Sequence, residues 1–193
     1  MNKTLLIGLT LALGGCASTS PSCTDSWSSE HCRTERLLYQ NDLMQARILI
    51  AVANPDGYPL AAALLERSAP FDRRGETDFY QALLSIHRAQ PATEVLPLLE
   101  QAAAKHHPHA IALLYKVYEQ PFLIDQPDPG QARRYREAYS ELDVARSGYP
   151  SFEKALEVVT QLVEPPPRTS MEYGLLPFRS RPQECGSRNG NRP

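Results

Sequence analysis

The sequence has little of what marks a nucleotide-binding, nucleic-acid-binding or membrane-spanning protein. It contains ten glycines and one tryptophan in 193 residues, and its formal net charge is only −2. Few glycines and few alternating β-branched runs argue against a β-sandwich or a glycine-looped nucleotide fold. The near-neutral charge gives no reason to expect a nucleic-acid partner. No apolar run approaches the roughly 20 residues that a membrane-spanning helix needs.

Catalytic and metal-binding signatures are also missing. The chain has no Gly-x-Ser-x-Gly elbow, P-loop, His-Glu-x-x-His or Cys-x-x-Cys. Its histidine cluster, His106-His107-x-His109, would hold zinc or copper only if a carboxylate joined it. Adjacent residues at a helix end point in different directions, and the helix dipole alone favours histidine there. The sequence therefore predicts a non-enzymatic protein with no catalytic residue, metal, cofactor or small-molecule substrate.

Residues 1–15 are typical of a signal peptide, because Leu5 to Leu13 form an apolar stretch too short to span a bilayer. The stretch ends in Leu13-Gly14-Gly15-Cys16, which resembles a bacterial lipobox. The resemblance implies that Cys16 is acylated and becomes the new N-terminus. Ala17 in the next position implies an outer-membrane lipoprotein that faces the periplasm. An ordinary secretory signal with an incidental cysteine is the alternative.

Composition divides the rest of the chain into three segments. Residues 16–32 are Ser-rich and are predicted to be a lipidated flexible tether. Residues 33–164 form the predicted helical repeat domain, and residues 165–193 a Pro/Arg-rich tail that opens with three prolines. Residues 16–164 carry 14 basic and 20 acidic side chains, a net charge of −6. The tail carries five arginines and two glutamates, a net charge of +3.

Apolar residues recur at three- and four-residue steps through the whole body. This periodicity predicts an all-α fold of about seven short helices. Glycines fall at the predicted junctions, where a positive φ costs little, and prolines follow at first-turn positions, where a missing N–H is tolerated. These residues are Gly57, Gly75, Gly130 and Gly148, with Pro59, Pro108 and Pro150.

Three turns of the chain, at Gly57, His106 and Gly148, are equivalent, because small and apolar residues recur at matching distances before and after each of them. In the first copy these are Ala46, Leu49, Ile50, Ala53, Ala61 and Leu65; in the second, Leu98, Leu99, Ala102, Ala103, Ala110, Leu114 and Tyr118; in the third, Asp128, Ala132 and Tyr135.

The pattern resembles the Sel1-like branch of tetratricopeptide-type helical repeats, over about residues 46–69, 95–118 and 128–160. The resemblance implies short helix-turn-helix units stacked as an α-solenoid that binds proteins. His106 stands where the family has a glycine. The first helix of the third copy is expected to run on to Gly148, and the spacing leaves room for an additional helix near residues 77–89.

Tyrosine and arginine gather in the C-terminal half, and both are enriched at interface hot spots. The tyrosines are alternatively core residues of the repeat, and the arginines a plain solvated face. The candidate partner-binding residues are Arg133, Arg134, Arg136, Tyr139 and Tyr149.

Three cysteines remain after lipidation, and an oxidising compartment predicts one disulfide among them. A Cys23–Cys32 bond would close a small loop in the tether. A Cys32–Cys185 bond, which we favour, would tie the tail to the first helix, and its longer loop stabilises more in the entropic account. The sequence leaves both pairings open.

Two functions are consistent with a lipid-anchored repeat protein of this kind. The first is a protein–protein interaction scaffold in an envelope assembly or export complex, with another envelope protein as its partner. The alternative is a periplasmic immunity protein or inhibitor that binds a secreted toxic enzyme. In both, the N-terminal lipid is the expected contact with the membrane.

Overall fold

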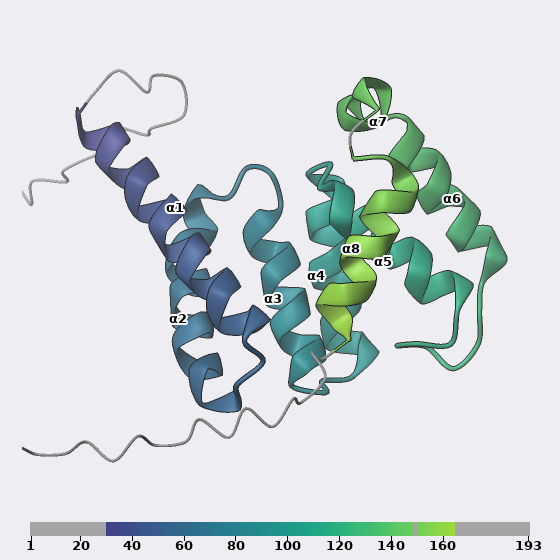
Figure 1. Cartoon of the computed structure of the whole chain (residues 1–193), viewed down its shortest axis with the longest axis horizontal. Coiled ribbons are helices and arrows are strands. Elements are labelled where there is room, and N and C mark those ends of the chain that lie inside the picture. The colour runs from purple at the N-terminus through teal and green to yellow at the C-terminus, as the bar shows by residue number, and fades with distance from the viewer. Residues whose placement is uncertain (1–29, 149, 165–193) are drawn as a thin grey trace, which may run out of the picture.

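The computed structural model describes residues 30–148 and 150–164, and this part of the chain is all-α, as predicted (Figure 1). It holds eight α-helices and two 3-10 turns, against the seven helices expected, and no strand. The helices are α1 (Glu30–Ala51), α2 (Tyr58–Ser68), α3 (Glu76–His87), α4 (Ala92–Ala104), α5 (Pro108–Glu119), α6 (Pro129–Ser140), α7 (Asp143–Ser147) and α8 (Phe152–Val163), with 3-10 turns η1 (Pro55–Gly57) and η2 (Ala69–Phe71).

Consecutive helices pack against one another as hairpins. The most extensive contacts join α1 with α2, α3 with α4, and α5 with α6, and further contacts join α2 with α3 and α4 with α5. Figure 1 shows the helices following one another from α1 at one end of the molecule to α6 at the other. Packing of this kind, in which each hairpin contacts its neighbours in sequence, is consistent with a helical-repeat solenoid. The additional helix expected near residues 77–89 is α3.

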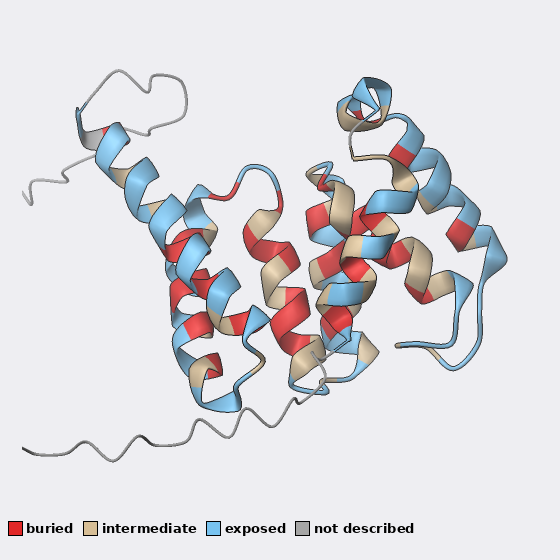
Figure 2. Cartoon of the chain, in the orientation of Figure 1, coloured by how far each residue is buried: buried red, intermediate tan, exposed pale blue. Residues whose placement is uncertain are grey.

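The core lies between the hairpins and is densest around α3, α4 and α5 (Figure 2). Phe79 on α3, Leu99 on α4 and Leu114 on α5 are completely buried. Helix α5 is apolar almost all round and is therefore covered on several sides. It contacts α4, α6 and α8, and Tyr115, Lys116 and Tyr118 in its second half are partly exposed.

The third repeat unit departs from the prediction. The expected helix from residue 128 to Gly148 breaks after Ser140, and the short helix α7 follows as a separate element. Leu142 interrupts the helix because its backbone is extended (ψ 146°) and its side chain is buried. Helix α8 then packs mainly on α5 and only slightly on α6, so the third unit is not a simple hairpin.

The junction residues were predicted correctly in part. Gly75 and Gly148 have positive φ, at 72° and 79°, but Gly57 and Gly130 do not. At the first junction it is Ala53 that takes the left-handed conformation (φ 53°), four residues before the glycine.

Two of the three junction prolines lie where the sequence predicted them. Pro59 and Pro108 lie in first helical turns, as predicted, because a proline there loses no hydrogen bond. Pro150 instead precedes the N-cap Ser151 of α8 and lies outside the helix. Helix α1 begins at Glu30, so the last three residues of the predicted tether are helical. None of the described helices is long and apolar enough to cross a membrane.

Candidate functional site

A pocket of about 390 Å³ opens between α6, the α7 turn and α8. It contains two of the candidate partner-binding residues. The aromatic rings of Tyr139 and Phe152 meet edge to face there, with 5.1 Å between their centroids. The residues that line the pocket are Arg136, Glu137, Tyr139, Ser140, Ala145, Gly148, Ser151 and Phe152.

Tyr139 is a wall of this pocket and not an exposed anchor. Its side chain is 1% exposed, and its hydroxyl donates a hydrogen bond of 2.8 Å to the carbonyl of Pro150. Burial, and then the charge of Glu153, raises the pKa of its phenol. The prediction that Tyr139 projects toward a partner was therefore wrong, because the break after Ser140 brings the start of α8 over its ring.

Arg136 lies at the mouth of the pocket and is exposed, as predicted. Its guanidinium carbon is 4.9 Å from the centroid of the Phe152 ring, within the range of a cation–π contact. Its Nη2 is 3.9 Å from Oε1 of Glu153. The Tyr115 ring meets Phe152 from another side, with 5.0 Å between centroids. Arg136 is thus held over an aromatic surface and stays accessible to a partner.

The three arginines do not form one strip. Arg134 donates a 3.0 Å hydrogen bond to Gln131, and its charge opposes the rise that burial causes in the pKa of Tyr135. Tyr135 stacks on Tyr118 at 5.7 Å, away from the pocket lining. Because successive residues of a helix differ by about 100°, Arg134 lies on another side of α6 from Arg136.

The remaining candidates at this end are Arg133 and Tyr149. Arg133 is exposed, as predicted. Tyr149 lies outside the described residues.

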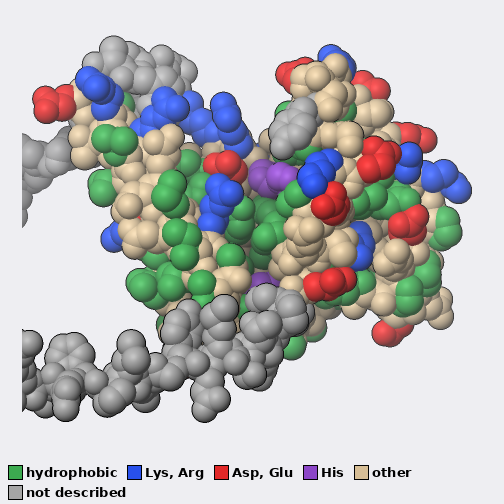
Figure 3. Space-filling model, in the orientation of Figure 1, with side chains coloured by type: hydrophobic (Ala, Val, Ile, Leu, Met, Phe, Trp, Pro, Cys, Tyr) green, Lys and Arg blue, Asp and Glu red, His purple; other side chains and the backbone are tan. Residues whose placement is uncertain are grey.

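Acidic side chains balance the arginines of this end of the molecule. Arg146 lies 3.5 Å from Glu141 and 3.8 Å from Asp143, and Glu137 lines the pocket beside Arg136. Figure 3 shows blue and red side chains interspersed on the part of the surface formed by this end. Exposed pairs of this kind add little to stability. Their effect is that the mouth of the pocket offers charges of both signs to a partner.

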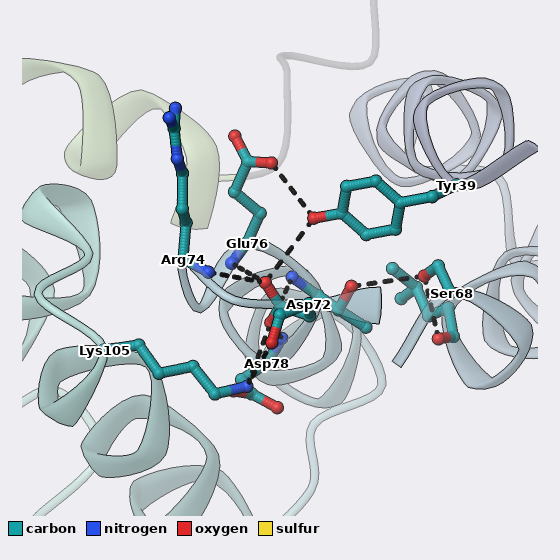
Figure 4. Close-up of polar contacts among 9 residues, drawn as sticks. Tyr39, Ser68, Asp72, Arg74, Glu76, Asp78 and Lys105 are labelled. Carbon is teal, nitrogen blue, oxygen red and sulfur yellow. Dashed lines mark hydrogen bonds and ion pairs between the residues drawn. The ribbon is translucent and has the colours of Figure 1, made fainter. Parts of the chain in front are cut away.

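A second polar cluster surrounds Asp72, and sequence reasoning missed it (Figure 4). The Asp72 carboxylate has no exposed surface and accepts backbone N–H bonds of 3.1 Å from Arg74, Glu76 and Thr77. These amides include the first donors of α3, which would otherwise be buried without partners. The sequence feature that could have revealed this cluster is the aspartate itself, which lies four residues before the start of α3. An ordinary N-cap residue lies directly before its helix.

Side chains from two other helices complete the Asp72 cluster. Lys105, at the end of α4, places its Nζ 3.3 Å from Asp72 and 2.7 Å from Asp78. Burial lowers the pKa of Lys105, but its bonds to these two carboxylates outweigh burial and the net shift is upward. Tyr39 of α1 donates hydrogen bonds to Asp72 and Glu76, and burial with both carboxylate charges raises its pKa. The cluster joins α1, α3 and α4, and we assign it a structural role.

The residues of the histidine cluster have structural roles at the turn between α4 and α5. His106 is exposed, and its backbone has a left-handed conformation (φ 61°). His107 is buried, stacks on Phe79 at 4.7 Å, and accepts a 3.2 Å hydrogen bond from Ala110 N–H at its Nδ1 as the N-cap of α5. Burial lowers the pKa of His107 to about 3. Within the described residues, no three histidine, cysteine or acidic side chains are grouped to hold a metal.

Cys32 is buried at the start of α1 and is disulfide-bonded. The other cysteines, Cys16, Cys23 and Cys185, lie outside the described residues, so the pairing of Cys32 with Cys185 stays a prediction. The lipidation of Cys16 and the tail also fall outside that range.

No protein family, curated protein or solved structure matches this chain. The resemblance to Sel1-like repeats therefore rests on the residue pattern alone.

Proposed function

We propose that the chain is a non-enzymatic lipoprotein of the outer membrane that faces the periplasm and binds another envelope protein through the α6–α8 pocket. The observation that carries the proposal is the mouth of the pocket, where exposed Arg136 lies 4.9 Å over the ring of Phe152. Arginine and aromatic residues next to a concavity are the usual composition of an interface hot spot. The lipid anchor is supported by the Leu13-Gly14-Gly15-Cys16 sequence.

The surroundings of the pocket support a protein partner. Tyr139 and Phe152 line the pocket together with the charged side chains of Arg136 and Glu137, and Glu153 lies 3.9 Å from Arg136. An apolar centre with a polar rim is the typical anatomy of a protein–protein interface. Fixed aromatic rings also lose little entropy on binding, because Tyr139 is already held by its hydrogen bond to Pro150.

Site-specific photo-cross-linking in cells tests the proposal. A photoreactive residue at Ser140, which is exposed and lines the pocket, is expected to capture one periplasmic protein. The matched control places the same residue at Glu66, exposed on α2 at the other end of the array. Arg136→Ala should reduce the Ser140 adduct, because it removes the cation from the mouth of the pocket. Equal adducts from both positions, or none from Ser140, would overturn the proposal.

The identity of the captured protein separates the two roles that the sequence leaves open. A component of an envelope assembly or export complex identifies a scaffold. Capture of a secreted toxic enzyme, only in cells exposed to that enzyme, would identify this chain as an immunity protein.

A further inference from the structure

Helix α1 leaves a long apolar stripe uncovered. Five large apolar side chains of this region are each more than half exposed: Leu37, Leu38, Met44 and Ile48 on the helix, and Val52 one residue after its end. Leu37, Met44, Ile48 and Val52 are separated by seven, four and four residues, so they line one side of the helix. The opposite side packs on the array through Leu43, Ala46 and Ile50. Figure 3 shows green side chains gathered over the α1 end of the molecule.

This stripe is unusual for the position of α1. A helix at the end of a repeat array normally has a polar outer face, because no further repeat covers it. Most exposed apolar side chains of monomeric proteins are scattered singly, and a continuous row marks a site of interaction. Elsewhere in the described residues, large exposed apolar side chains are few and separate: Leu60, Phe71 and Phe122.

The charges beside the stripe select the kind of partner. Arg33 and Arg47 are exposed on α1, and the guanidinium of Arg47 lies 5.1 Å from the centroid of the Tyr80 ring of α3. The acidic residues that follow Arg33 on this helix do not reach its exposed side, because Asp42 is buried and bonded to Arg67, and Glu35 is half-buried. Glu30 is the exposed acidic residue of this helix, against exposed Arg33, Arg36 and Arg47. An apolar stripe on a helix with an excess of exposed cations matches a helix that lies in the interface of an anionic bilayer.

The place of α1 in the chain points to the same partner. Cys16 precedes the start of α1 at Glu30 by 14 residues, a length that spans at most about 50 Å. A lipid on Cys16 therefore holds α1 close to the membrane, and α1 is the first helix of the described residues. Confinement near the surface raises the effective concentration of the stripe at the bilayer, so weak insertion is sufficient.

We infer that α1 docks its Leu37–Met44–Ile48–Val52 stripe on the anionic phospholipid surface to which the chain is anchored. This inference rests on the lipid anchor of the proposed function, but not on the α6–α8 pocket. In Figure 1, α6 lies at the end of the array opposite to α1. Docking through α1 therefore leaves the α6–α8 pocket open to a partner.

The test uses the full lipidated chain on vesicles of phosphatidylethanolamine and phosphatidylglycerol. A photoreactive residue replaces Ile48, and mass spectrometry identifies what it captures after illumination. The matched control replaces Ala138, exposed on α6 at the other end of the array. Phospholipid adducts are expected at position 48 and at least fivefold fewer at position 138.

Each other outcome overturns the inference in a distinguishable way. An adduct to a second copy of the chain, or to the chain's own tail, assigns another occupant to the stripe. Equal lipid adducts at positions 48 and 138 remove the special role of α1. A protein that floats with vesicles but gives no lipid adduct at position 48 leaves the anchor intact and refutes only the docking. A wild-type chain that does not float refutes the anchor and the docking together.

A combined variant checks that the stripe itself makes the contact. Leu37→Gln, Met44→Gln and Ile48→Gln together should abolish lipid adducts from a photoreactive residue at Val52. The same chain should still float with vesicles through Cys16 and keep its melting temperature, because all three side chains are exposed. Undiminished adducts at Val52 would overturn the inference.

Discussion

The backbone of Ala102 approaches Gly75 so closely that a methyl group on the glycine would lie 2.7 Å from the Ala102 Cα and carbonyl oxygen. This contact brings the start of α3 against the last turn of α4. Gly75 also has a left-handed backbone, with φ at 72°. The junction between α7 and α8 offers a comparison, because Gly148 has φ at 79° and a methyl group on it would have nothing within 4 Å.

The two glycines separate backbone strain from close packing. Gly148→Ala should destabilise the fold by about 1 kcal/mol, the cost of a left-handed alanine. Gly75→Ala carries that same cost and also forces α3 and α4 apart, so its loss should be at least about 2 kcal/mol larger. Urea unfolding of both variants measures the difference. Equal losses would mean that α3 and α4 do not meet at Gly75.

The Asp72 cluster should contribute more than an ordinary helix cap. Asp72→Ala leaves buried N–H groups at the start of α3 without an acceptor and removes the partner of Lys105, so we expect a loss of about 3 kcal/mol. Asp128→Ala is the control. Asp128 caps α6 through the amides of Gly130 and Gln131 but is exposed, and its loss should be about 1 kcal/mol. Chemical unfolding that ranks the two variants equally would contradict a special role for the cluster.

His107 should make the stability depend on pH. Its pKa is about 3 in the folded chain and 6.5 in the unfolded chain, so below pH 6.5 only the unfolded chain takes up the proton. Stability is therefore complete above pH 6.5 and falls as the pH drops below it, by up to about 1.4 kcal/mol per pH unit. His107→Asn keeps an oxygen for the Ala110 N–H but cannot titrate.

Urea unfolding between pH 7 and pH 5 compares His107→Asn with the wild type. The variant should lose about 1–2 kcal/mol less than the wild type over this interval. Parallel pH profiles would show that His107 is protonated in the folded chain. His109 is also partly buried and its pKa is lowered by burial, so a residual slope in the variant is expected.

Leu114 tests the core around α5. Its side chain is completely buried, and Leu114→Ala should cost about 2–5 kcal/mol. Leu60→Ala on α2 removes the same atoms from a side chain that is 54% exposed and should cost well under 1 kcal/mol. The melting temperatures of the two variants measure the contrast. A small loss at Leu114 would show that α5 is not central to the fold.

The anchor is tested by replacing the cysteine of the lipobox-like sequence. Cys16→Ser should abolish incorporation of a radioactive fatty acid, because the sulfur that carries the acyl chains is gone. Cys23→Ser is the control and should keep the label. Label in both variants would show that Cys16 is not the lipidated residue.

The sequence by itself determined the fold class, the number of helices to within one, and most of the junctions. Apolar residues repeat with the helical period, and this local pattern is enough to predict helices such as α3 at Glu76–His87. Gly148 also had its predicted left-handed conformation, because only glycine adopts it without cost. These features depend on residues that are near one another in the chain.

Only the tertiary structure decided which faces of the helices are covered. Tyr139 belongs to the same periodic pattern as exposed residues of α6, and its burial follows from α8 folding back over it after the break at Leu142. Asp72 meets Tyr39 and Lys105, each 33 residues away in sequence, through the stacking of α1, α3 and α4. The exposed stripe of α1 became visible for the same reason, because periodicity marks an apolar face but cannot say whether another helix covers it.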